Sequence, residues 1–350
     1  MDLTPLEDKQ HSVRGSGFYV QYLQDSLLEY DRKNEYIFFT RKDGIPKVAD
    51  VVHIPYFEPF FLTLPLFSGR PSVVTVHDLI PIIFLKHFPS GIKGRLIWEK
   101  QKASLKRVSA IITDSKTSKI DIVKHVGVRE EKVHVVYLAS DEQFHKIDIS
   151  SETTSVDQLR KKYNLPSSFA LYVGDVTWNK NVPRIVQACQ HANVPLVMVG
   201  KAVSEKNFNR NNPWNIDRVR VEELVKDDKQ IVLLGFVPTE DLVIIYNLAT
   251  VFVMPSLYEG FGIPILEAMG CGCPVITSRE GSLPEVAGDA AYYVDAYSVA
   301  SITYAITTIY SNRKLRKELA QKSLLRAKIF SWANTARKTI ALYEQAYKSS

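Results

Sequence analysis

The chain contains few cysteines and no long apolar run. Its 350 residues include three cysteines, Cys189, Cys271 and Cys273, and an odd, sparse set is a poor disulfide framework, so we expect a reducing compartment. No unbroken apolar stretch approaches the roughly 18 residues of a membrane-spanning helix, and the first residues lack the apolar segment of a signal peptide. We therefore expect a soluble, cytoplasmic protein. Without a second pair or a histidine cluster, Cys271 and Cys273 are expected to be buried thiols rather than a metal site.

Signatures of nucleic-acid and nicotinamide binding are also missing. The sequence has no zinc-finger spacing, helix-turn-helix pattern or basic-aromatic RNA motif, so we expect no nucleic-acid partner. Gly15 and Gly17 are not followed by the third glycine of the dinucleotide-binding fingerprint, and no clear strand precedes them. A dehydrogenase is therefore disfavoured.

Short apolar segments alternate with longer amphipathic ones along the chain. This alternation is typical of an α/β protein with parallel sheets covered by helices. The predicted strands are 36–40, 51–53, 72–76, 110–113 and 133–136 in the first half, and 169–173, 196–199, 230–233, 251–254 and 274–276 in the second. At 350 residues the chain is long enough for two domains. The polar segment 146–158 is the candidate linker between them.

Two glutamates, Glu259 and Glu267, stand eight residues apart around a glycine loop. An apolar strand precedes this loop, and the segment 263–269 that follows is predicted to be helical. Free N–H groups at the start of such a helix can bind a phosphate, while one carboxylate accepts from sugar hydroxyls and the other from a ribose. Taken alone, such a pair is more often two solvated glutamates beside an ordinary loop.

Six segments, in order, resemble the family 4 retaining glycosyltransferases. The likeness is strongest in PSLYEGFGIPILEAMGCGCPVITS with the following 281–286; the other segments are 14–19, 75–79, 112–119, 170–181 and 234–238. The resemblance implies the GT-B fold, an α/β architecture of two Rossmann-like domains with parallel sheets that face each other across a cleft. Residues 1–147 would form the acceptor-binding domain, with the C-terminal helix 335–350 packed back onto it. Residues 148–334 would bind the nucleotide-sugar donor.

The resemblance also implies catalytic roles for three residues. Lys180 would neutralise the diphosphate, Glu259 would hold hydroxyls of the donor sugar, and His77 would lie near the transferred sugar. Taken alone, Lys180 would be a plain surface lysine, and His77 is nearly as well explained as a buried structural histidine.

Further residues would bind the rest of the donor. Glu267 would accept from the ribose, and the backbone near Val237 would meet the nucleobase. Neutral N–H donors to the phosphates would come from two glycine loops, at Gly15 and Gly17 and at Gly260, Phe261, Gly262 and Ile263. No aspartate pair stands where a metal would bridge the diphosphate. The resemblance therefore implies metal-independent transfer, with the nucleotide-diphosphate sugar as substrate and no further cofactor.

The net charge of +6 is concentrated in one segment. Residues 91–120 contain eight lysines and arginines against two acidic residues. Such a segment either contacts an anionic membrane at its inner face, attracts a diphosphate acceptor, or is an ordinary solvated helix.

Three features depart from the family pattern. Asp175 stands where some relatives have an arginine, and Asn179 where a basic residue often precedes the lysine. The first family strand is also missing before residues 1–6, so either the start lies upstream or the first sheet lacks its central strand.

The sequence predicts a retaining hexosyltransferase that acts on a glycan or lipid-linked acceptor in surface polysaccharide synthesis. The segments 77–81 and 87–89 most resemble family members that move mannose or related hexoses, and this resemblance favours GDP-mannose. The departures keep an inactive nucleotide-sugar sensor or partner subunit as the alternative.

Overall fold

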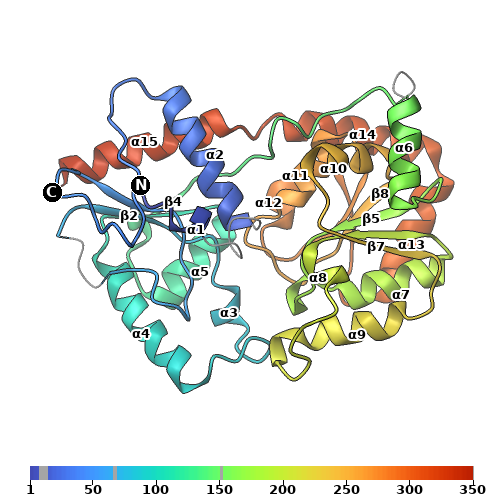
Figure 1. Ribbon diagram of the computed structural model, residues 1–350, viewed down its shortest axis with the longest axis horizontal. Coiled ribbons are helices and arrows are strands. Elements are labelled where there is room, and N and C mark those ends of the chain that lie inside the picture. The colour runs from blue at the N-terminus through green and yellow to red at the C-terminus, as the bar shows by residue number, and fades with distance from the viewer. Residues whose placement is uncertain (8–14, 66–68, 150–152, 350) are drawn as a thin grey trace. The chain divides into compact units, whose positions relative to one another are not determined.

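The computed structural model describes residues 1–7, 15–65, 69–149 and 153–349 (Figure 1). Arg14, part of the first resembling segment, lies outside the described residues. The chain divides into two compact units, one of Met1–Ala139 with Phe330–Ser350 and the other of Ser140–Ile329. Among the described residues, no helix has both the length and the apolar character that crossing a bilayer requires.

The first unit contains a four-stranded parallel sheet in the order β1-β2-β3-β4. Its strands are β1 Val52–Ile54, β2 Ser72–Thr75, β3 Ala110–Thr113 and β4 Val133–Val135. Its helices are α1 Thr4–Glu7, α2 Gly15–Tyr30, α3 Ile80–Ile83, α4 Gly91–Arg107, α5 Lys116–Val126 and α15 Trp332–Lys348, with a short 3₁₀ turn at Glu130–Lys132. The first three strands are buried along their whole length, as expected for a parallel sheet with helices on both faces.

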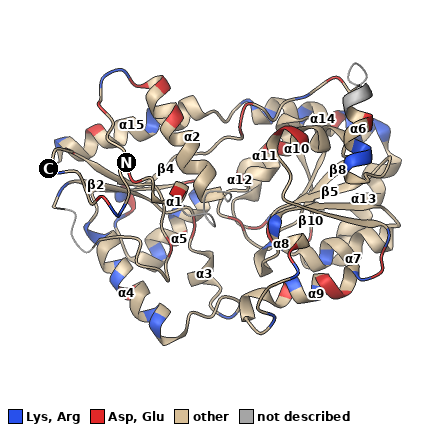
Figure 2. Ribbon diagram, viewed as in Figure 1, with Lys and Arg blue, Asp and Glu red and all other residues tan. Residues whose placement is uncertain are grey.

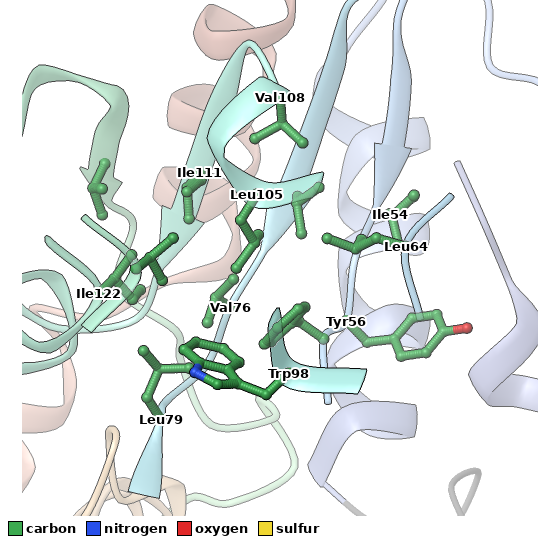
Figure 3. Packing of buried hydrophobic residues seen from close by; sticks show 14 of the residues in the cluster. Ile54, Tyr56, Leu64, Val76, Leu79, Trp98, Leu105, Val108, Ile111 and Ile122 are labelled. Carbon is green, nitrogen blue, oxygen red and sulfur yellow. The ribbon is translucent and has the colours of Figure 1, made fainter. Parts of the chain in front are cut away.

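Alternate residues of these strands supply two separate cores. On one face, Ile111 belongs to the cluster that contains Leu105 of α4 and Ile122 of α5 (Figure 3). On the other face, Ile112 packs in a cluster with Leu342 of α15. Because successive side chains of a strand point to opposite faces of the sheet, the neighbours Ile111 and Ile112 join different clusters. Helix α15 belongs to the first unit because it supplies part of the second cluster.

The prediction of a strand at 36–40 is wrong. Only Phe39 pairs there, in a single bridge with Asp2, and the N–H of Leu3 donates to the carbonyl of Phe39 at 2.8 Å. The partner segment is short because Pro5 has no N–H to donate and α1 begins at Thr4. A single bridge cannot extend into a ladder without further partner residues.

The second unit contains a six-stranded parallel sheet in the order β10-β9-β8-β5-β6-β7. Its strands are β5 Ala170–Val173, β6 Leu196–Val199, β7 Ile231–Gly235, β8 Val251–Met254, β9 Val275–Ser278 and β10 Ala291–Val294. The strand β10 was not predicted. The order runs outward in both directions from the neighbouring strands β5 and β8, so the sheet has a topological switch point there. In open α/β sheets, ligands bind outside the carboxyl ends of the strands at such a point.

Helices cover the strands of the second sheet and join them in sequence. They are α6 Thr153–Tyr163, α7 Val182–Ala192, α8 Lys201–Ser204, α9 Ile216–Val225, α10 Thr239–Leu248, α11 Ile263–Gly270, α12 Leu283–Ala287, α13 Val299–Ser311 and α14 Arg313–Ala327, with 3₁₀ turns at Trp178–Lys180 and Pro213–Asn215. The second half of the predicted linker 146–158 is therefore helical, because α6 begins at Thr153.

Candidate functional site

The loops that follow β5 and β8 meet in a buried ion pair. Lys180 follows β5 and Glu259 follows β8, and the Lys180 Nζ lies 2.8 Å from the Glu259 Oε2. The Glu259 side chain is only 6% exposed and that of Lys180 21%. The other carboxylate oxygen of Glu259, Oε1, is buried and no described residue bonds to it. A buried acceptor without a partner is costly, so this oxygen is suited to a hydroxyl donor from a ligand.

Two asparagines join the loop that contains Lys180, here called the lysine loop, to the loop that contains Glu259, the glutamate loop. Asn179 donates from its side chain to the carbonyl of Tyr258 at 3.1 Å, and Asn181 donates to the carbonyl of Pro255 at 2.9 Å. Asn181 has a φ of 60°, a left-handed conformation that asparagine tolerates better than most residues. The asparagine before Lys180, a departure from the family pattern, thus holds the two loops together.

The backbone of the glutamate loop is fixed from a third side. The hydroxyl of Ser282 donates to the carbonyl of Glu259 at 3.0 Å and to that of Phe261 at 2.9 Å. Gly281 has a φ of +59°, and a Cβ there would lie 2.7 Å from the Glu259 carbonyl oxygen. A glycine is therefore required at this position, since the loop approaches it more closely than any side chain allows.

Helix α11 begins directly after this loop. Gly262 precedes it with a φ of 102°, and a Cβ there would lie 3.2 Å from the Leu283 Cδ2. Ile263 is the first residue of the helix, where backbone N–H groups have no partner within the helix. The predicted strand, glycine loop and helix are all present.

Glu267 lies one turn into α11, with its carboxyl group enclosed. Its Oε2 accepts a hydrogen bond of 2.8 Å from the hydroxyl of Tyr246 in α10. Burial of the carboxyl group raises the pKa of Glu267 to about 7, against the opposing effect of the Tyr246 hydrogen bond. Glu267 is therefore poised between its neutral and charged forms near neutral pH.

In the first unit, His77 follows β2 and forms a pair with Asp114, which follows β3. The His77 Nδ1 lies 2.7 Å from the Asp114 Oδ2, and the His77 side chain is 23% exposed. Burial disfavours the charged imidazole, but the Asp114 carboxylate outweighs it and raises the pKa of His77 above its ordinary value. The Asp114 carboxylate holds a proton on Nδ1 and orients the ring. The other nitrogen, Nε2, has no hydrogen-bond partner among the described residues.

Comparison with known proteins gives the family. Residues 155–325 match the glycosyl transferases group 1, and residues 39–144 match Glycosyltransferase Family 4. The O-antigen chain mannosyltransferase B of Escherichia coli is 31% identical over 280 residues, which cover 78% of this chain and 70% of that protein. The chain belongs to glycosyltransferase family 4. The serotype-specific mannosyltransferase WbdA of Escherichia coli is 29% identical over 287 residues. These residues cover 80% of the present chain but only 34% of the length of WbdA.

The α/β fold of this family 4 glycosyltransferase agrees with solved structures. Sucrose-phosphate synthase from Thermosynechococcus elongatus superimposes with a TM-score of 0.74 at 20% identity, over 97% of this chain and 95% of that one. The prediction of the GT-B fold class, with two parallel sheets, is confirmed.

The structure corrects one of the two predicted glycine loops of the glycosyltransferase. Gly15 and Gly17 lie in the first turn of α2, not in a loop. Residues with small side chains suit a helix start as well as a loop, and the sequence pattern does not separate the two. Val237 is buried in the connection between β7 and α10, and its contact with a nucleobase remains a prediction. The described residues bring no three His, Cys, Asp or Glu side chains together as a metal site would need, and metal independence remains a prediction.

Sequence reasoning did not single out three residues that contact candidate site residues within their own units: Asp114, Tyr246 and Ser282. A signal for Asp114 was present, since it and His77 each follow one of two adjacent parallel strands, whose carboxyl ends share an edge. No comparable signal marks Tyr246, because its partner Glu267 comes from a different helix.

Proposed function

We propose that this chain is a retaining hexosyltransferase that uses a nucleotide-diphosphate sugar, with mannose as the favoured hexose. The supporting observation is the buried pair of Lys180 and Glu259 at the switch point of the second sheet, with one Glu259 oxygen left without a described partner. Two E. coli mannosyltransferases among the relatives support the choice of mannose, and GDP-mannose is the donor that we propose. The acceptor would be a glycan or a lipid-linked glycan of a surface polysaccharide.

Each proposed role follows from charge and geometry. Cleavage of the donor develops negative charge on the leaving phosphate, and Lys180 supplies the cation that stabilises it. The N–H groups at Gly262 and Ile263 add neutral donors at the start of α11. Glu259 accepts from hydroxyls of the donor sugar, and Glu267 from those of the ribose. The backbone near Val237 would contact the nucleobase.

In the first unit, the His77 Nε2 would bond to a hydroxyl of the transferred sugar while Asp114 fixes the ring. Retention would arise from attack on the same face of the donor sugar, with the departing phosphate taking the acceptor proton. Neither step needs a metal.

The test is transfer by the purified chain. We expect release of GDP from GDP-mannose in the presence of a mannose-containing glycan, with the α-configuration of the donor kept in the product, as read by NMR. The same assay with UDP-glucose measures donor choice. Inversion at the anomeric carbon would overturn the retaining assignment.

The alternative is a nucleotide-sugar sensor without catalytic activity. It is favoured by Asp175, whose acidic side chain replaces a cation of some relatives near the lysine loop. Saturable binding of GDP-mannose with no GDP release above background, across the acceptors of a lipid extract, would establish the sensor instead.

We also propose that α4 contacts an anionic membrane. Lys and Arg residues recur along this helix (Figure 2), and it exposes Ile92 to 81% and Leu96 to 62%. Charged and apolar side chains together suit the surface of a bilayer.

Charge reversal tests this contact. The triple variant Lys100→Glu, Lys102→Glu and Lys106→Glu should no longer sediment with phosphatidylglycerol vesicles. The matched control reverses three lysines of the equally basic α14, at Lys314, Lys317 and Lys322, and should sediment like wild type. Binding should fade with salt, since the screening length is about 8 Å at physiological ionic strength. Equal sedimentation of wild type and the α4 variant would leave α4 an ordinary solvated helix.

A further inference from the structure

An open groove follows the outer edge of β4 in the first unit. β4 is the last strand of its sheet, and the part of the chain that the structure describes places no further strand beside it. Helix α5 packs on one face of the sheet and α15 on the other. The groove between them has a volume of about 860 Å³ and is lined by all three elements.

The backbone of β4 directs hydrogen-bonding groups into this groove. The N–H of Val136 donates to Thr113 of β3 at 2.9 Å. Since successive residues of a strand direct these groups to opposite sides, Val135 directs its N–H and C=O away from β3. The C=O of Val133 also points away from β3, whereas its N–H donates to the carbonyl of Glu130. Val135 therefore directs one acceptor and one donor to the groove, whereas Val133 is only 1% exposed.

The groove also combines an apolar floor with positive charge. Ile120 at its side is 66% exposed, and valines of β4 and Leu342 of α15 continue the apolar lining. The charged side chains that line it are four lysines and one glutamate, namely Lys116, Lys119, Lys124, Lys338 and Glu130. A negatively charged ligand with apolar groups therefore matches the groove.

We propose that this groove docks an extended acidic peptide segment of a partner protein, which adds a strand to β4. A peptide N–H donates to the carbonyl of Val135, and a peptide carbonyl accepts from the Val135 N–H. Its apolar side chains cover Ile120, and its carboxylates pair with Lys124 and Lys338, since Lys119 already lies 3.5 Å from Glu130. An anionic lipid matches the charge and the floor, but its tail leaves the backbone groups of Val135 without partners when water is excluded.

The probe is a fluorescent, end-blocked peptide of eight residues that alternates glutamate and valine, titrated against the full chain. We expect saturable binding with a dissociation constant below about 1 mM, which weakens with salt. Hydrogen exchange at the Val135 amide should slow on binding. A peptide that is N-methylated at every residue has the same side chains but no backbone N–H donors, and it should bind at least about tenfold more weakly.

Two variants locate the site. Lys124→Glu with Lys338→Glu should weaken the peptide by about tenfold, because two attractions become repulsions. Lys317→Glu in α14 is the matched control and should leave binding unchanged. Val135→Pro removes only an N–H that faces the groove, which an edge strand tolerates, and it should also weaken binding.

The outcomes separate the alternatives. Absence of peptide binding, equal binding of the N-methylated peptide, or unchanged binding by the double lysine variant each overturns strand addition. Protection of the Val135 amide by phosphatidylglycerol vesicles but not by the peptide would identify a lipid site instead. If Val135→Pro does not fold, as judged by circular dichroism, the N-methylated peptide on wild type still decides the question. None of these measurements depends on glycosyl transfer.

Discussion

Glu259 and Glu267 belong to one loop and helix, yet their carboxyl groups have opposite surroundings. Glu259 pairs with a cation, since its Oε2 lies 2.8 Å from the Lys180 Nζ. Among the described residues, Glu267 has no ion-pair partner, and it accepts a hydrogen bond from Tyr246. Its burial raises its pKa to about 7. The same stretch of sequence thus holds one charge-compensated carboxylate and one that is partly protonated at neutral pH.

This difference suggests that the two residues respond differently when a nucleotide sugar binds. In the proposed function, Lys180 must turn towards the phosphates, so the pair with Glu259 is shared or broken. Glu267 must lose its proton before both oxygens can accept from ribose hydroxyls. When the nucleotide sugar binds, Glu259 would therefore change its ion-pair partner, whereas Glu267 would lose a proton.

The largest effect is expected from removing the cation. Lys180→Ala should lower the turnover number by about a hundredfold to a thousandfold, because the leaving phosphate loses its charge stabilisation. It should also destabilise the second unit, since Glu259 stays buried without its partner. Steady-state release of nucleoside diphosphate and thermal unfolding measure the two effects.

A double variant separates structure from chemistry. Lys180→Ala with Glu259→Gln removes the uncompensated charge, so it should regain most of the lost stability. Transfer should stay low, because no cation has been restored. If the double variant regained transfer as well, Lys180 would serve only to neutralise Glu259.

The next effect is a pH dependence carried by Glu267. Its pKa is raised from its ordinary value of 4.5 to about 7 in the folded protein. The resulting stability is full below about pH 4.5 and is lost as the pH rises through about 7, at most about 3 kcal/mol. Between pH 5 and 8, the unfolding midpoint of wild type should therefore fall relative to that of Glu267→Gln, which cannot titrate. Parallel curves for the two proteins would contradict the raised pKa.

The smallest expected effect is that of a chelator. If Lys180 and the N–H groups before α11 suffice for the diphosphate, an excess of EDTA should leave wild-type transfer unchanged. A dependence on added Mg²⁺ or Mn²⁺ would mean that a metal ion shares the neutralisation of the diphosphate with Lys180. The contrast between Glu259 and Glu267 would then have to include that metal ion.

Much of this architecture was predictable from local patterns. The bounds of β3, β6 and β8 agree with prediction, since each is a short buried apolar run. β10 was missed because Ala291–Val294 is only four residues long and is flanked by the loop-forming residues Gly288, Asp289 and Asp295. The glutamate loop was recognisable from its glycines, because only glycine adopts the φ of Gly262 with ease.

The partners within the site were not predictable in the same way. The ion pair of Lys180 and Glu259 joins residues 79 positions apart, and the hydrogen bond from Tyr246 to Glu267 joins two helices. Such contacts depend on strand order, which single-sequence patterns do not specify. The prediction of a glycine loop at Gly15 and Gly17 failed for a different reason, since small residues begin helices and loops alike.

The central claim is that Glu267 binds the nucleotide while Glu259 serves the sugar. Isothermal titration of GDP into wild type, Glu267→Ala and Glu259→Gln tests it most directly. We predict that Glu267→Ala loses about 1–3 kcal/mol of binding free energy. Glu259→Gln should bind GDP at least as tightly as wild type, because Lys180 is released for the phosphates, while its turnover falls. Equal loss of GDP affinity in both variants, or in neither, would contradict the account.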